Sequence, residues 1–132
     1  MILVDTSVLI NYFKGANNEK VNRFDIILAK KIPFGINQLI YLELLQGAAN
    51  EKEYTKLDEY LSTQNYYELT GGFNSYRKCA QMYMKCRRNG ITIRSTVDLL
   101  IAQTAIDNNL YLLHDDKDFT MIAKVNTSLQ EW

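Results

Sequence analysis

Short apolar runs alternate along the chain with longer stretches in which apolar residues recur every three or four positions. The short runs have the length of buried strands, and the longer stretches have the period of amphipathic helices. Strands alternating with helices are typical of βαβ units, in which helices cover both faces of a parallel sheet. The pattern therefore predicts an α/β fold, a three-layer α/β/α sandwich with a central parallel β-sheet. The predicted strands are residues 2–4, 32–36, 66–69 and 110–113.

The helical stretches carry boundary residues that indicate where each helix begins. Side-chain oxygens of Ser, Thr and Asn accept hydrogen bonds from the free N–H groups of a first turn. The expected caps are Thr6 or Ser7, Asn37, Asn50 with Glu53 as a capping box, and Ser95 or Thr96. The predicted helices are 8–13, 19–30, 38–46, 50–61, 74–88, 97–107 and a short one around Phe119.

Length and composition describe one globular domain. A chain of 132 residues with 47% hydrophobic content is long enough for one buried core, so we expect a single domain over residues 1–132. No apolar run approaches the ~18 residues that a membrane helix needs, and the N-terminus has no basic leader. We therefore expect a cytoplasmic protein without membrane contact.

The two cysteines agree with that location. Cys79 and Cys86 lie on one predicted helix, which places their Cα atoms about 10.5 Å apart, too far for a disulfide. A zinc site would need further Cys or His ligands, and the chain has one His. We expect buried, reduced thiols.

Acidic residues occupy positions that suggest a site. Asp5 directly follows the first predicted strand, and Asp115 and Asp116 follow the last one. In open parallel sheets, sites form at the carboxyl ends of the strands. Glu43 and Asp98 lie in apolar helical runs, where an isolated ionised carboxylate is costly unless it is paired or binds a metal.

Each acid alone has a simpler interpretation. Asp5 could only cap a helix, Glu43 could be the polar position of an amphipathic turn, and Asp98 could favour a helix dipole. In combination they predict convergence on one edge of the sheet. Carboxylates without His or Cys ligands prefer Mg²⁺ or Mn²⁺, the ions of phosphodiester chemistry. The lone His114 is expected to be structural or solvated, not a general base.

Four segments, in order, resemble the motifs of the PIN-domain nucleases, and within them the VapC toxins of type II toxin–antitoxin systems. They are ILVDTSVLI (2–10), YLELLQG (41–47), VDLLIA (97–102) and LLHDDKDF (112–119). The resemblance spans nearly the whole chain. It implies a PIN-like α/β/α sandwich, Mg²⁺ or Mn²⁺ dependence, endoribonuclease activity on RNA, a homodimer and a VapB-type antitoxin partner.

The resemblance also assigns roles. It makes Asp5, Glu43, Asp98 and Asp116 the catalytic, metal-binding acids, with Thr6 and Ser7 as hydroxyl partners. Asp115 and Asp118 compete with Asp116 for the fourth position, and Asp118 is otherwise a supporting or second-metal residue.

The charge pattern bears on the RNA partner. Fifteen Lys+Arg balance fifteen Asp+Glu, which argues against a polybasic nucleic-acid binder. However, the acid-free stretch between Glu68 and Asp98 carries six bases, as an RNA backbone would require. The expected RNA contacts are Lys85, Arg87, Arg88 and Arg94. A solvated helix face is the other interpretation of these cations.

Three other functions fit parts of the pattern. A housekeeping PIN nuclease in RNA processing would share the chemistry without an antitoxin, and a neighbouring small reading frame would distinguish the two. A receiver-type signalling module also gathers acids at strand ends. It would require a second acid beside Asp5, where Thr6 stands. A catalytically inactive RNA-binding module conflicts with the filled acidic positions.

Overall fold

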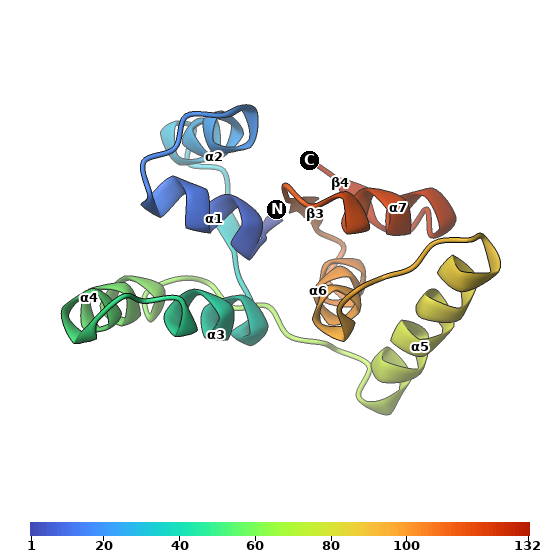
Figure 1. Ribbon diagram of the computed structural model, residues 1–132. Helices are drawn as coiled ribbons and strands as arrows, with labels where there is room; N and C mark the ends of the chain where they lie inside the picture. The colour runs from blue at the N-terminus through green and yellow to red at the C-terminus, as the bar shows by residue number, and fades with distance from the viewer.

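The computed structural model describes residues 1–132 and contains four parallel strands in the order β2-β1-β3-β4 (Figure 1). The strands are β1 (Ile2–Val4), β2 (Phe34–Gly35), β3 (Tyr111–Leu113) and β4 (Gln130–Glu131). The chain adds β2 on one side of β1 and returns to place β3 on the other side. The strand order therefore switches between β1 and β3, which is where open α/β sheets bind ligands.

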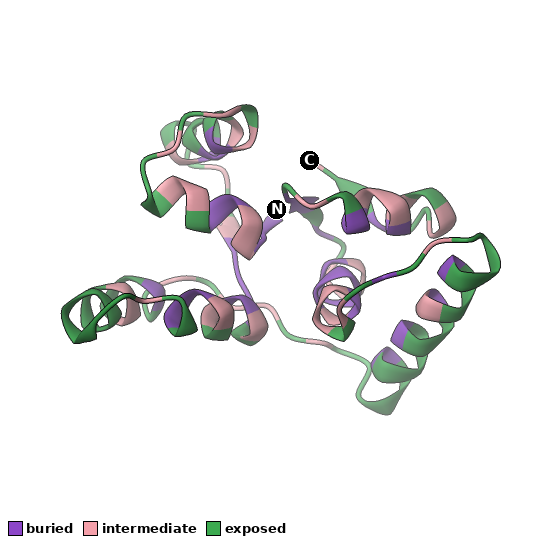
Figure 2. Cartoon of the chain, in the orientation of Figure 1, coloured by how far each residue is buried: buried purple, intermediate pink, exposed green.

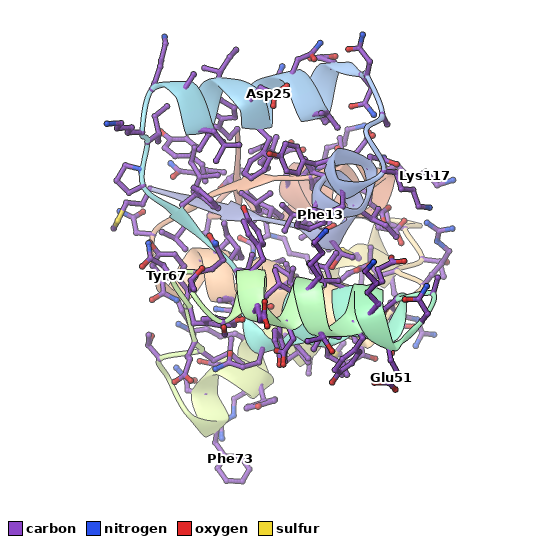
Figure 3. All side chains as sticks on the ribbon, turned by 90° about the vertical axis from the view of Figure 1, so that its left-hand side faces the viewer. Phe13, Asp25, Glu51, Tyr67, Phe73 and Lys117 are labelled. Carbon is purple, nitrogen blue, oxygen red and sulfur yellow. The ribbon has the colours of Figure 1, made fainter.

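Seven helices cover the sheet, and the predicted α/β sandwich with a parallel sheet is confirmed. Figures 1 and 3 show α2 on one face of the strands and α3 and α6 on the other. α5 packs against α6 and α7, and α4 packs against α3. The helices are α1 (Thr6–Phe13), α2 (Glu19–Ala29), α3 (Gln38–Gln46), α4 (Glu51–Leu61), α5 (Phe73–Arg88), α6 (Thr96–Asp107) and α7 (Lys117–Val125).

Side-chain caps begin several helices where the sequence predicts them. Asn37 and Asn50 each accept a hydrogen bond from the N–H three residues later, at 2.9 and 2.8 Å. Ser95 accepts from the N–H of Val97 at 3.2 Å. These caps satisfy N–H groups that have no partner within the helix, so the start of each helix is set locally.

The core is a cluster of 26 buried hydrophobic residues with members from β1, β3 and all seven helices. Leu3 and Val4 of β1 have no exposed surface, and α6 buries six of its residues. Figure 2 shows this contrast, with buried residues on α6 and mostly exposed residues on α4 and α5. No helix combines the length and apolar character that crossing a membrane requires.

The predicted strand over residues 66–69 is wrong. Only Tyr66 forms a bridge, to Ile36. The chain then leaves the sheet, and the carbonyl of Glu68 accepts a hydrogen bond from the Asn108 side chain at 2.8 Å. A run of apolar and aromatic residues is therefore used here to pack beside the sheet, not to extend it.

The strand predicted over 32–36 is shortened to β2, and β4 has no counterpart in the prediction. Both residues of β4 are polar and exposed, so no hydrophobic pattern marks it. Its pairing with β3 is extended by the N–H of Trp132, which donates to the carbonyl of Leu112 at 3.0 Å.

Candidate active site

Acidic side chains gather where β1 and β3 end. Asp5 directly follows β1, and its N–H donates to the carbonyl of Leu113, the last residue of β3, at 2.9 Å. Asp116 follows β3 and caps α7. α3 brings Glu43 and α6 brings Asp98 to the same edge, close enough for the charge of Asp5 to act to raise the pKa of both.

Asp5 is buried and caps α1, which corrects the prediction that Thr6 or Ser7 is the cap. Its Oδ2 accepts hydrogen bonds from the N–H of Ser7 at 3.0 Å and from the Ser7 hydroxyl at 2.6 Å. The Ser7 Oγ in turn accepts the N–H of Asp115 at 2.8 Å. Burial raises the pKa of Asp5, although the bonds from Ser7 act to lower it. Ser7 thus links the ends of the two strands.

Glu43 lies half-buried on α3 beside Asp5. The Thr6 hydroxyl donates to its Oε1 at 2.9 Å. Burial raises the pKa of Glu43, the Thr6 hydrogen bond lowers it, and the charge of Asp5 raises it again, for a net rise. Two consecutive hydroxyl residues therefore each orient one acid: Thr6 holds Glu43 and Ser7 holds Asp5.

Asp98 lies half-buried in the first turn of α6. Burial first, and then the charges of Asp116, Asp5 and the other acids, raise its pKa to about 7. No hydrogen bond to its carboxylate opposes this rise. The helix N-terminus favours a negative charge but does not outweigh these effects. Such a carboxylate is stabilised when a cation joins the site.

Three carboxylates, those of Asp98, Asp116 and Asp118, form an acid cluster in which they lie within ligand reach of one another. One oxygen each from Asp98, Asp116 and Asp118 lies within 4.8 Å of the other two. Asp116 caps α7 by accepting the N–H of Asp118 at 2.9 Å, and this turn directs the buried Asp118 inward. Asp115 is exposed. The group includes Asp118, predicted as a competitor for the fourth acid or as a supporting or second-metal residue, and leaves Asp5 and Glu43 beside it.

A PIN-domain family model matches residues 2–125 of this chain. The chain belongs to the PIN-domain family. VapC ribonuclease Mb1587 of Mycobacterium bovis and ribonuclease VapC11 of Mycobacterium tuberculosis are each 30% identical to it over 131 residues, covering 98% of this chain and 96% of the relative. Ribonuclease VapC51 of M. tuberculosis is 31% identical over 131 residues, covering 98% of this chain and 90% of the relative.

Solved structures share the fold of this PIN domain. A chain of VapBC2 from Rickettsia felis, in a complex with a promoter DNA fragment, superposes with a TM-score of 0.76 at 22% identity, covering 100% of this chain and 98% of the other. A chain of VapBC-1 from nontypeable Haemophilus influenzae gives 0.73 at 23% identity, covering 100% and 97%. The predicted PIN-like fold is confirmed.

The donor set of this PIN domain fits a hard divalent cation. The three grouped residues offer carboxylate oxygens only. These oxygens lie close enough together to bind one ion, and Mg²⁺ prefers oxygen ligands. Cys79 and Cys86 are free and buried on α5, as predicted. A divalent cation that binds oxygen ligands is therefore the cofactor class that the site accepts.

The predicted RNA-contacting cations of the PIN domain separate into two groups. Lys85, Arg87 and Arg88 are exposed in the last turn of α5, and their contact with RNA stays a prediction. Arg94 instead reaches the acid cluster, with its Nε 3.2 Å from Oδ2 of Asp118. The charge pattern identified Arg94 as a cation near the site but did not reveal this partner.

His114 is buried behind the acidic turn, so of the two expected roles, structural or solvated, the structure favours the structural one. Its Nδ1 accepts the N–H of Asp116 at 3.1 Å, and its Nε2 lies 2.7 Å from Oε2 of Glu131. Acceptance at Nδ1 places the ring proton on Nε2, so the ring donates to Glu131. The imidazole thereby ties β4 to the turn that presents Asp116, a role that sequence reasoning missed because β4 was not predicted.

Proposed function

We propose that this PIN domain is a Mg²⁺-dependent endoribonuclease of the VapC type, the toxin of a type II toxin–antitoxin pair. The observation that carries the proposal is the convergence of carboxylates from distant parts of the chain on the edge where β1 and β3 end. They are Asp5, Glu43, Asp98, Asp116 and Asp118. Relatives named as VapC ribonucleases and the likeness to chains of VapBC complexes support it.

In this proposal Asp98, Asp116 and Asp118 hold the Mg²⁺, with Asp5 and Glu43 completing the negatively charged group of side chains. Mn²⁺ is expected to replace Mg²⁺, because it prefers the same oxygen ligands. Such an ion supplies an activated water and neutralises charge on a phosphodiester. Thr6 and Ser7 hold Glu43 and Asp5 in place, so that the negative charges of the acids can stabilise one bound cation.

The partners follow from the same proposal. Lys85, Arg87 and Arg88 contact RNA phosphates, which carry no sequence information but position the strand. The whole chain, residues 1–132, acts as one PIN domain, pairs with a second copy and is restrained by a VapB-type antitoxin.

The test is RNA cleavage by purified protein. We expect cleavage with Mg²⁺, none with excess EDTA, and none by Asp98→Asn. Asp25→Asn is the matched control, because Asp25 is an exposed acid on α2 (Figure 3), a helix that carries none of the five acids of the site. Cleavage by Asp98→Asn at the parent rate, or in EDTA, would falsify the metal-site assignment.

The toxin role is tested separately in cells. Induced expression of the parent should arrest growth, and Asp98→Asn should not. Co-expression of a small antitoxin-like protein encoded beside this gene should restore growth. Active enzyme without growth arrest would instead indicate a housekeeping nuclease.

A further inference from the structure

Arg94 places its guanidinium against the acid cluster. It lies in the segment between α5 and α6. Its Nε is 3.2 Å from Oδ2 of Asp118, and its backbone N is 3.5 Å from the same oxygen. Its Nη2 is 3.6 Å from Oδ1 of Asp116. One side chain of this chain thus contacts two of the three carboxylates that lie within ligand reach of one another.

The exposure of the partners is strongly asymmetric. The Asp118 side chain is 6% exposed and that of Asp116 is 29% exposed, whereas that of Arg94 is 65% exposed. All hydrogen bonds to the Asp118 carboxylate come from Arg94. A buried carboxylate without a partner is costly, so the guanidinium provides the positive charge that the cluster requires.

We propose that Arg94 is a built-in counter-ion of the acid cluster, which competes with the divalent cation for Asp116 and Asp118. The inference rests on the proposed function, because it assumes that these acids hold the ion. A guanidinium in contact with both carboxylates and a divalent ion on the same carboxylates would repel each other at close range. Binding of the ion therefore requires the guanidinium to move away.

The surroundings of Arg94 allow that movement. Its side chain is mostly exposed, and its only ion pairs are those with Asp116 and Asp118. The long stem can rotate toward solvent without displacing the backbone. The contact of Arg94 with RNA stays a prediction.

The experiment measures binding of Mn²⁺ to metal-free protein, by electron paramagnetic resonance or calorimetry. We expect Arg94→Gln to bind Mn²⁺ about fivefold more tightly than the parent. Arg94→Lys should bind only about twofold more tightly, because Lys keeps the charge and loses the planar fork. Lys117→Gln is the matched control. It removes an exposed cation that makes no ion pair with the cluster and lies at the periphery in Figure 3, and should change affinity less than twofold.

Thermal unfolding gives a second readout. Arg94→Gln should unfold at a lower temperature than the parent in EDTA, and saturating Mn²⁺ should remove most of the difference. If Arg94→Gln does not fold, the expected affinity gain of Arg94→Lys decides.

Three results overturn the inference. Equal or weaker binding of Mn²⁺ by the Arg94 variants would mean that Arg94 supports the ion or ignores it. An equal gain in Lys117→Gln would mean a general field effect. Both of these leave the proposed function intact as long as the parent binds Mn²⁺. A parent that binds no Mn²⁺ ends both proposals.

Discussion

The two ends of α6 each carry a half-buried aspartate, and the pKa values of these two acids are shifted in opposite directions. Asp98 lies in the first turn, where the helix dipole favours a negative charge, yet its pKa is raised to about 7. Asp107 ends the helix, where the dipole opposes a negative charge, yet its pKa lies below the usual value. The helix dipole predicts the reverse order, so nearer groups must decide.

Hydrogen-bond donors account for the difference. Burial acts to raise the pKa of Asp107, but bonds from the Ser75 hydroxyl at 2.6 Å, Gln103 at 2.8 Å and the N–H of Thr70 at 3.0 Å outweigh it. Asp98 has acidic neighbours instead of donors. Asp107 therefore links α5 to α6 as a structural residue, whereas the charge of Asp98 is repelled by its acidic neighbours until a proton or a metal ion binds.

The largest expected effect concerns activity. Asp98→Asn should lower Mg²⁺-dependent RNA cleavage by more than about 100-fold, beyond the 10–100-fold that loss of a residue supporting a ligand costs. Asp107→Asn should cleave within about threefold of the parent, because Asp107 is not a ligand in the proposed site. The measurement is the initial rate on a labelled RNA. Equal losses of cleavage rate in the two variants would contradict the different roles assigned to Asp98 and Asp107.

The next effect concerns stability. Asp107→Ala should lower the free energy of unfolding by about 2 kcal/mol, because it leaves the buried donors of Ser75 and Gln103 without their acceptor. Urea denaturation of metal-free protein measures this value. Asp98→Ala serves as the comparison and should not destabilise. A stable Asp107→Ala protein would show that the bonds at this end of α6 contribute little.

A smaller effect on RNA cleavage is expected from the Thr6 hydroxyl, which donates a hydrogen bond to Glu43, an acidic neighbour of Asp98. Thr6→Val removes the bond to Glu43 and keeps the side-chain shape, so cleavage should fall about tenfold. Thr55→Val on the exposed face of α4 is the control and should leave the rate unchanged. If both variants match the parent, the orientation of Glu43 does not depend on Thr6.

The smallest expected effect is the pH dependence of the metal-free protein. Between the ordinary pKa of Asp98, 3.8, and its folded pKa of about 7, the folded state holds the proton more tightly than the unfolded chain. Stability should therefore fall as pH rises through this range. Asp98→Asn should remove part of that fall, making the variant about 1 kcal/mol more stable than the parent at pH 8, a value reduced for the partial exposure of Asp98.

Urea denaturation in EDTA at pH 5 and pH 8 measures this difference. Asp107 acts in the opposite sense, because its lowered folded pKa gives stability that is present above its unfolded pKa and is lost in acid as pH falls through the folded pKa. A parent and an Asp98→Asn variant with parallel pH profiles would contradict the electrostatic state assigned to Asp98.

Features that depend on neighbours along the chain could be predicted from the sequence. The caps at Asn37 and Asn50 and the acids placed after the first and last predicted strands are local patterns, and the structure has them where they were expected. Parallel strand ends meet at one edge, so convergence of the acids followed from the fold class.

Which of these groups contact one another depends on the packing of distant elements and could not be predicted from the sequence. It placed Asp118 in the cluster with Asp98, directed Arg94 into that cluster, and used the exposed polar β4 to hold His114. Each of these contacts joins residues that are far apart in the chain. The first also distinguishes Asp118 from Asp116, two residues before it. Such a choice depends on distances of a few ångströms between side chains on different elements, and the periodicity of a sequence carries no information at that scale.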